Sequence, residues 1–255
     1  MQYTLKKSLG QHFLKDEHIC KQIVAALQQS QSATGITQWL EVGPGAGALT
    51  KYLLPLPGIN FKAVELDTEK VNYLQHTYPA IQGKIIHQDF LEIAPPFTDS
   101  FLVVGNFPYN ISTQIVFKVL DWKAQVPVMI GMFQKEVAER IVSKKGSKVY
   151  GILSVLVQAF FAVEYLFDVP PESFNPPPKV MSGVIRFTAL ENKPAIRSER
   201  DLYVLVKAAF NQRRKMLRNA VKSLFDETVL EEALFSKRAE QLSVEDFAAL
   251  TFRMR

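Results

Sequence analysis

The chain has 255 residues, of which 47% are hydrophobic, and it carries a formal net charge of +5 and a single cysteine. This length allows one medium-sized domain with a buried core and a small second domain. One cysteine excludes an intramolecular disulfide and a cysteine-based zinc cluster, and four scattered histidines lack metal-ligand spacing, so we expect no bound metal.

The N-terminal residues favour a cytoplasmic protein. Lys6 and Lys7 are followed by no apolar run, and no later stretch offers about 18 charge-free apolar residues, so we expect neither secretion nor a membrane span.

Cys20 lies in a pattern with Ile23 and Val24 that is typical of a helix face. We interpret its thiol as a packing group, with a nucleophilic role as the alternative.

Five short apolar, β-branched segments then alternate with helical patterns. Their apolar runs are too continuous for strands with one exposed face, which predicts βαβ units around a buried parallel sheet. The predicted strands lie at residues 38–42, 60–66, 84–88, 101–105 and 126–133, with helices at residues 49–54, 69–78 and 113–120.

A glycine-rich turn follows the first predicted strand. It reads Gly43-Pro44-Gly45-Ala46-Gly47, and glycines let a backbone turn tightly and approach a ligand closely. The dinucleotide fingerprint G-x-G-x-x-G is not met, because the third glycine lacks the required spacing. Glu65, at the end of the second strand, can accept hydrogen bonds from both hydroxyls of a ribose, which suits NAD and S-adenosylmethionine equally.

Asp89 follows the third strand and favours S-adenosylmethionine. A carboxylate at this position can accept a hydrogen bond from the amine of an adenine, while Phe90 lies against the ring. Taken singly, Glu65 and Asp89 could be solvated acids at strand ends. Together with Gly43 and Gly45 they predict a cofactor site.

The fourth strand ends in the most informative stretch, Asn106-Phe107-Pro108-Tyr109. An adenine amine is a poor nucleophile because its lone pair is delocalised into the ring. The Asn106 side-chain carbonyl and the Phe107 backbone carbonyl can accept its hydrogens and favour a pyramidal nitrogen, while Pro108 holds the turn. Methyl transfer then needs in-line alignment more than a strong base. Tyr109 is placed to stack on the target base.

The next segments predict a helix at residues 150–161 and strands at residues 163–169 and 181–188. A proline-rich connection joins the two strands, which suits the antiparallel edge of an otherwise parallel sheet of about seven strands. Phe174 in this connection is a candidate for the opposite face of the target base, with packing as the alternative.

The pattern becomes helical from Asp201 onward, after a linker at residues 191–198. Residues 193–222 hold nine Lys or Arg against two acids, a local charge of +7, whereas the other 225 residues sum to −2. This concentration suggests a surface that faces a polyanion, with a solvated helix face as the alternative. The apolar positions with helical period are Leu202, Leu205, Val206, Ala209, Leu217, Val221 and Leu224.

These motifs together resemble the ribosomal small-subunit RNA adenine dimethyltransferases, almost from end to end. The glycine turn is shared by many methyltransferases, whereas the last matching segment is far more specific. The matching segments are Leu9-Gly10-Gln11-His12-Phe13-Leu14, Glu41-Val42-Gly43-Pro44-Gly45, Val64-Glu65-Leu66-Asp67, Gln88-Asp89, Gly105-Asn106-Phe107-Pro108-Tyr109-Asn110-Ile111-Ser112-Thr113, Gln134-Lys135-Glu136-Val137, residues 174–180 and Ala209-Phe210-Asn211-Gln212-Arg213-Arg214-Lys215.

The resemblance implies an α/β fold. A Rossmann-like class I methyltransferase domain at residues 1–192 would precede a small all-helical, RNA-binding domain at residues 193–255. It also implies S-adenosylmethionine-dependent N6,N6-dimethylation of two adjacent adenosines in the 3′-terminal hairpin loop of small-subunit ribosomal RNA, with a role in subunit assembly. Nothing in the sequence demands more than a monomer.

The resemblance carries residue roles over to this chain. Many family members have Asn at the position of His12 and Leu at that of Phe107. The expected phosphate contacts are Arg213, Arg214, Lys215 and Arg218. The expected cofactor contacts are His12, Leu14, Gly43, Glu65, Asp89 and Asn106, to which the glycine turn adds Gly45.

Three alternatives stay open. The related antibiotic-resistance methyltransferases of large-subunit RNA share the glycine turn and the Asn-x-Pro-Tyr segment, but Arg213-Arg214-Lys215 with Arg218 resembles the small-subunit enzymes. A DNA adenine methyltransferase would carry a DNA-recognition module, which nothing here resembles. A non-catalytic assembly factor would not need an intact Asn106-Phe107-Pro108-Tyr109 segment.

Overall fold

The computed structural model describes residues 12–255. Lys6, Lys7 and the first three residues of the N-terminal motif, Leu9-Gly10-Gln11, lie outside the described residues. The chain forms two compact units, which we call unit 1 and unit 2. Unit 1 comprises the chain up to Ala138 together with Glu164–Ala189, and unit 2 comprises Glu139–Val163 together with Leu190–Arg255. The expected division at residue 192 falls near Leu190, but the segment Glu139–Val163, placed by the sequence in the first domain, groups with unit 2.

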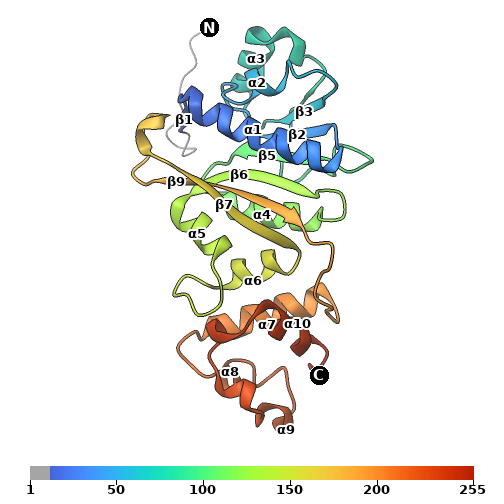
Figure 1. The fold of residues 1–255 in the computed structure, drawn as a ribbon, viewed down its shortest axis with the longest axis vertical. Helices are drawn as coiled ribbons and strands as arrows, with labels where there is room; N and C mark the ends of the chain where they lie inside the picture. Colours follow the sequence, from blue (N-terminus) through green and yellow to red (C-terminus); the bar gives the residue numbers. More distant parts are fainter. Residues whose placement is uncertain (1–11) are drawn as a thin grey trace. The chain divides into compact units, whose positions relative to one another are not determined.

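The central sheet has seven strands (Figure 1). Across the sheet they are β4 (Ile85–Ile86), β3 (Asn60–Val64), β2 (Gln38–Val42), β5 (Leu102–Asn106), β6 (Val128–Gln134), β9 (Ser182–Ala189) and β7 (Phe161–Val169). The strands from β4 to β6 pair in parallel, and β9 pairs antiparallel with β6. The predicted mostly parallel sheet is confirmed. The last two long strands lie together at one edge of the sheet, as predicted, with β9 next to β6 and β7 outermost.

The order of the strands creates a switch point in the sheet. The chain runs outward from β2 through β3 to β4 and then returns to form β5 on the other side of β2. The loops that leave the carboxyl ends of β2 and β5 therefore run in opposite directions and leave a crevice, which is where open α/β sheets bind their ligands. Strands β5 and β6 are buried along almost their whole length, as their continuous apolar runs predicted.

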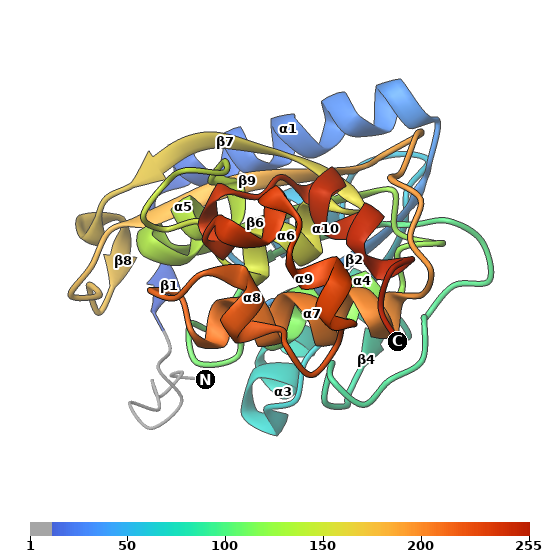
Figure 2. The ribbon, with the colours of Figure 1, turned by 90° about the horizontal axis from the view of Figure 1, so that it is seen from below.

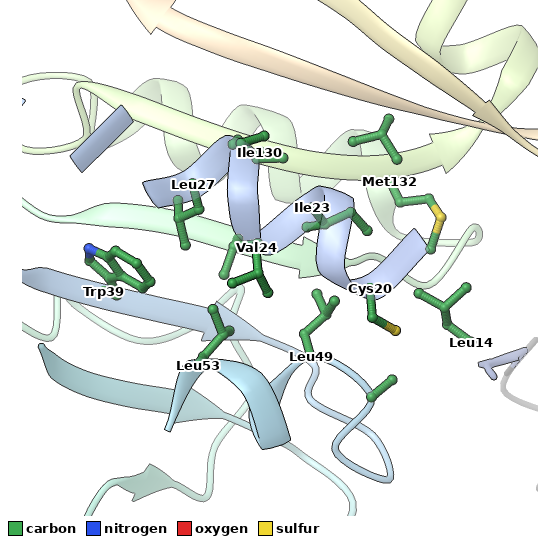
Figure 3. Close-up of a cluster of buried hydrophobic side chains, with 14 of the residues drawn as sticks. Leu14, Cys20, Ile23, Val24, Leu27, Trp39, Leu49, Leu53, Ile130 and Met132 are labelled. Carbon is green, nitrogen blue, oxygen red and sulfur yellow. The ribbon is translucent and has the colours of Figure 1, made fainter. Parts of the chain in front are cut away.

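Helix α1 (Glu17–Thr34) covers one face of this sheet. It begins at Asp16, whose carboxylate accepts hydrogen bonds from two backbone N–H groups of the first turn, and it ends at Gly35 in the left-handed conformation. Cys20 and Leu27 lie on its buried face and point toward the hydrophobic cluster around Trp39 (Figure 3). The packing role predicted for Cys20 is confirmed, and burial raises the pKa of its thiol to about 12, so the thiol stays protonated.

The remaining elements of unit 1 connect or flank the strands. Figure 2 shows α1 on one side of the central strands and α4 on the other. A separate two-stranded antiparallel sheet pairs Leu14 with Phe174. The remaining elements of unit 1 are α2 (Thr50–Leu53), α3 (Thr68–Thr77), α4 (Ser112–Asp121), α5 (Lys135–Val142, which runs into unit 2), β1 (Phe13–Leu14), β8 (Phe174–Asn175) and the 3₁₀ helices η2 (Pro79–Ile81) and η3 (Pro171–Ser173).

Unit 2 is helical, as expected for the C-terminal region. Its elements are α6 (Ile152–Gln158), α7 (Glu199–Asn211), α8 (Leu217–Ala220), α9 (Glu227–Leu230), α10 (Val244–Thr251) and the 3₁₀ helices η4 (Ala233–Ser236) and η5 (Ala239–Gln241). The Phe210 ring packs against the rings of Tyr150 and Phe247, with centroids 6.0 and 5.8 Å away. Of the helices between residues 12 and 255, none has the length and apolar character that crossing a membrane requires.

The buried face of α7 is the predicted one, but its helical period does not continue into α8. Leu202, Leu205, Val206 and Ala209 are all buried. Helix α7 ends at Asn211 and α8 begins only at Leu217. The basic residues between these two positions therefore lie in a turn, not on a helix.

Candidate active site

A cavity in unit 1 opens at the switch point, where the carboxyl ends of β2, β3 and β5 meet. It collects residues that are almost 100 positions apart in the sequence. The cavity is lined by His12, Phe13, Leu14, Glu41, Gly43, Pro44, Gly45, Ala46, Ala48, Leu49, Glu65, Lys70, Asn106, Phe107, Pro108 and Tyr109.

The glycine turn forms one wall of the cavity. Gly43, Gly45 and Gly47 all have positive φ, at 68°, 60° and 87°, a backbone conformation that only glycine adopts without strain. A Cβ built at Gly43 or Gly45 would meet no atom closer than 3.9 Å, so the space above the turn is open. The sequence requirement for glycine is thus conformational, and the turn leaves room for a ligand to approach the backbone.

Glu65 ties the glycine turn to the end of β3. Its carboxylate accepts hydrogen bonds from the backbone N–H groups of Gly45 (3.1 Å) and Asp67 (3.0 Å). The Nζ atom of Lys70, on α3, lies 3.9 Å from the same carboxylate, and both side chains are buried. A carboxylate has about four lone-pair sites, so Glu65 can accept further hydrogen bonds from a ligand. The sequence missed Lys70, whose position three residues after the Asp67 cap was the only signal.

Glu41 is a second acid in the cavity wall, and its burial changes its protonation. It lies on β2, is only 2% exposed and hydrogen-bonds the Thr50 hydroxyl at 2.6 Å. Burial is the main cause that raises the pKa of Glu41 to about 8, and the nearby charge of Glu65 raises it further. The neutral acid thus joins the strand before the glycine turn to the helix after it. In the sequence, Glu41 stands out only as an acidic residue within an otherwise apolar strand segment.

The Asn106–Tyr109 turn forms the opposite wall. The side-chain Nδ2 of Asn106 donates to the backbone carbonyl of His12 at 3.4 Å, which leaves Oδ1 as the acceptor for a ligand. The Phe107 ring is buried beneath the turn and contacts the Phe133 ring edge-on at 5.2 Å. A Cβ at Gly105 or Gly131 would come within 2.5 Å of the Phe107 ring. These two glycines therefore make room for the Phe107 ring.

Tyr109 projects into the cavity beside His12. The two ring centroids lie 5.6 Å apart with planes tilted by 32°. The Nδ1 atom of His12 lies 2.8 Å from the carbonyl oxygen of Pro176. Because that oxygen can only accept, Nδ1 is the donor of this hydrogen bond. The Tyr109 hydroxyl lies 2.5 Å from that of Ser182, and burial raises the pKa of this phenol.

Two predicted site residues lie outside the cavity lining. Asp89 is half-buried, and its carboxylate accepts a hydrogen bond from the Leu91 N–H at 2.9 Å. Phe90 packs edge-on against Trp122 at 5.2 Å instead of facing open space. Phe174 is 1% exposed and belongs to the hydrophobic core, so it offers no free ring face. Phe174 pairs with Leu14, which lines the cavity, but neither Phe174 nor Asp89 reaches the lining itself. The roles predicted for these two residues stay predictions.

The candidate phosphate contacts lie in unit 2, in and after the α7–α8 turn. Arg214 and Lys215 are exposed. Arg213 is instead held by the Glu240 carboxylate at 2.9 Å and by the Ser147 carbonyl at 3.4 Å. The Nε atom of Arg218 is buried without a hydrogen-bond partner among residues 12–255. The four cations therefore differ in how freely they can meet a ligand.

A second basic segment lies beside this turn. Lys144, Lys145 and Lys148 are exposed in the loop that follows α5. The Gly146 N–H of this loop donates to the Glu240 carbonyl at 2.7 Å, next to the Arg213 ion pair. Sequence reasoning missed these lysines because they precede Arg213 by at least 65 residues and were assigned to the sheet domain.

The sheet order, the glycine turn and the cavity at the switch point define the Rossmann-like fold of the class I methyltransferases. The family model described as ribosomal RNA adenine dimethylase matches residues 2–253. The chain therefore belongs to the ribosomal RNA adenine dimethylase family.

Named relatives match this chain along nearly its whole length. A protein of Flavobacterium johnsoniae named ribosomal RNA small subunit methyltransferase A is 53% identical over 96% of this chain and 94% of its own length. A protein of Cytophaga hutchinsonii with the same name is 49% identical over 96% and 95%.

Solved structures share the fold. A dimethyladenosine transferase from Plasmodium falciparum superposes with a TM-score of 0.73 at 24% identity, covering 92% of this chain and 94% of that chain. The 23S rRNA methyltransferase ErmE superposes with a TM-score of 0.69 at 22% identity, covering 95% and 99%. At these identities the two structures support the fold alone.

Proposed function

We propose that this protein uses S-adenosylmethionine to dimethylate the N6 amines of two adjacent adenosines in the 3′-terminal hairpin loop of small-subunit ribosomal RNA. The observation that carries the proposal is one cavity in which the glycine turn and Glu65 face the Asn106–Tyr109 turn. A donor pocket and an amine-binding turn must share one space for a methyl group to pass between them. Action as a monomer in the cytoplasm, with a role in small-subunit assembly, belongs to the same proposal.

The residues present fit S-adenosylmethionine. The open space above the Gly43–Gly45 backbone suits the part of the cofactor that must approach closely. The Glu65 carboxylate can accept hydrogen bonds from the ribose hydroxyls, and the apolar side chains of Leu14 and Leu49 line the same cavity. His12 and Asn106 complete the proposed contacts. When bound, the cofactor supplies a methyl group on a positively charged sulfur.

The chemistry assigned to the chain's own residues is the orientation of the amine. Asn106 Oδ1 and the Phe107 carbonyl accept hydrogen bonds from the two amine hydrogens, which directs the nitrogen lone pair into the cavity. The Tyr109 ring stacks on the adenine, a contact that contributes about 1–3 kcal/mol per base. After the nitrogen has accepted the first methyl group and released one proton to solvent, one amine hydrogen remains. A single acceptor therefore suffices for the second transfer.

Preference for the small subunit is supported by the two relatives named small-subunit methyltransferases at 49–53% identity. The exposed cations Arg214 and Lys215 in unit 2 suit contacts to phosphates, which position an RNA without reading its bases. The fold likeness to ErmE keeps the large-subunit enzymes as the rival.

The test offers labelled S-adenosylmethionine with unmethylated small subunits, large subunits and naked RNA in parallel. We expect label in small-subunit RNA. Label only in large-subunit RNA would replace this proposal by the rival, and binding to small subunits without any transfer would favour a non-catalytic assembly factor.

A further inference from the structure

We propose that Ser182 is a positioning residue for the reaction, because its hydroxyl holds the Tyr109 ring at the angle at which the target adenine stacks. This inference rests on the proposed function, in which Tyr109 contacts the base. Ser182 lies on β9, some 70 residues beyond the Asn106–Tyr109 turn, and is absent from the cavity lining. It would act through Tyr109 alone.

The hydrogen bond between the two side chains is short, and its serine partner is fully buried. The Tyr109 Oη and Ser182 Oγ atoms lie 2.5 Å apart, and Ser182 is 0% exposed. Ser182 pairs with Gln134 in the antiparallel β6–β9 ladder, and the Met181 carbonyl accepts a hydrogen bond from the Lys135 N–H at 2.9 Å. The backbone around Ser182 is therefore fixed by the β6–β9 pairing. The Ser182 hydroxyl is a hydrogen-bond partner on a rigid strand for the side chain of Tyr109, which projects from a turn.

A second contact restrains the same ring. The imidazole of His12 lies beside Tyr109 and is itself held by the Pro176 carbonyl. Pro176 and Ser182 belong to the same stretch of chain, between β8 and the start of β9. The proline-rich connection thus helps to hold the Tyr109 ring on which the adenine stacks. It does so through the Pro176 carbonyl oxygen and the Ser182 hydroxyl oxygen, not through the ring of Phe174.

Fixing the ring matters because stacking depends on its plane. A tyrosine side chain without further contacts can rotate about two bonds. If the adenine has to stop this rotation when it binds, the lost entropy weakens binding. A ring that is already fixed in the free protein avoids this cost. Removal of the Ser182 hydroxyl would also leave the hydroxyl of the half-buried Tyr109 without this partner. Burial raises the pKa of Tyr109, so its hydroxyl stays neutral and serves in this bond rather than as a base.

The competing explanation is that the bond only stabilises the fold. A double-mutant cycle separates the two roles. The single-turnover rate of label transfer from S-adenosylmethionine to unmethylated small subunits would be measured for the unchanged protein, Ser182→Ala, Tyr109→Phe and the double variant. Cofactor affinity and thermal unfolding would be measured for all four.

Positioning predicts a specific pattern. Each single variant should transfer about 3- to 10-fold more slowly, the range covered by one hydrogen bond of ordinary strength. The double variant should be no slower than Tyr109→Phe, because both changes remove the same bond, and cofactor affinity should change less than about 2-fold. Ser30→Ala is the matched control: Ser30 is a buried serine of α1 that donates to the Ala26 carbonyl at 3.0 Å, and its removal should leave the rate unchanged.

A wild-type transfer rate in Ser182→Ala, or losses that multiply in the double variant, would overturn the inference. If Ser182→Ala fails to fold, Tyr109→Phe removes the same bond from the other side and must show the rate loss by itself; a normal rate would again overturn the inference. Absence of transfer by the unchanged protein would instead contradict the proposed function, so the two failures are distinguishable.

Discussion

The cavity of unit 1 and the α7–α8 turn of unit 2, which we call the basic turn, differ in how firmly their candidate functional side chains are held. In the cavity, each candidate side chain is fixed by a neighbour: Glu65 by the backbone of Gly45, and Tyr109 by Ser182. In the turn, Arg214 and Lys215 are exposed. Chemistry needs atoms held in place, whereas binding to a polyanion needs only charge within reach. We therefore expect single substitutions to have large effects in the cavity and small, additive effects in the turn.

The largest effect is expected at Asn106. Asn106→Ala removes the acceptor proposed for the amine, and we expect methyl transfer to fall by at least about 100-fold, since misplacement of a reacting group has effects of that size. Binding to small-subunit RNA should stay within about 2-fold. A transfer rate within 10-fold of the unchanged protein, measured in single turnover, would remove Asn106 from the reaction.

A smaller effect is expected at Glu65. Glu65→Gln keeps the shape of the side chain but replaces a charged acceptor by a neutral one. The affinity for S-adenosylmethionine should fall by about 10- to 100-fold, because a hydrogen bond to a charged group contributes roughly 1.5–3 kcal/mol. Calorimetric titration checks this. Glu69→Gln is a matched control, because Glu69 lies nearby on α3 but outside the cavity lining; an equal loss in both variants would mean that Glu65 has no special contact.

The buried acid Glu41 predicts a pH dependence of stability. Its pKa is about 8 in the folded chain against a usual 4.5, so between these values the folded state holds a proton that the unfolded state has released. The free energy of unfolding should therefore decrease as pH rises through this window, by at most about 1.4 kcal/mol per pH unit, relative to Glu41→Gln, which cannot titrate.

Denaturant unfolding of both proteins at pH 5 and pH 8 measures this difference. The stability of the unchanged protein relative to Glu41→Gln should be higher at pH 5 than at pH 8. A difference that is the same at both pH values would show that Glu41 is ionised in the folded protein.

The smallest effects are expected in the basic turn. Arg214→Ala and Lys215→Ala should each weaken RNA binding by about 5-fold at physiological salt and lower the slope of its salt dependence by about one. Arg213→Ala should act differently, because Arg213 is bound to Glu240 and Ser147. It should increase proteolysis or hydrogen exchange in the loop of residues 143–148. Equal salt slopes for all three variants would contradict this distinction.

The contrast between the two regions also explains what the sequence could predict. Motifs that are continuous in the chain, such as the glycine turn and the Asn106–Tyr109 turn, have the conformation that their residues require, and they lie together because parallel strands end at one edge. The ends of the predicted strands lie within about two residues of the observed ones, and this includes β4, which is shortened to Ile85–Ile86.

Features that depend on distant parts of the chain were not predictable. The insertion of β9 between β6 and β7 is set by sheet topology, and it is this insertion that brings Ser182 to Tyr109. The burial of Phe174 depends on its pairing with Leu14, which lies 160 residues earlier. The loop at residues 143–148, which carries three lysines, lies beside Arg213 because Gly146 of this loop and Arg213 both bind Glu240. A linear pattern does not report such pairs.

The most direct test of the central claim is the identity of the product. Small-subunit RNA methylated by the unchanged protein and by Asn106→Ala would be digested to nucleosides and analysed by mass spectrometry. We expect two N6,N6-dimethyladenosines per RNA with the unchanged protein and almost none with Asn106→Ala. A product that stops at monomethyladenosine, or methylation of another base that persists in Asn106→Ala, would contradict the proposed function.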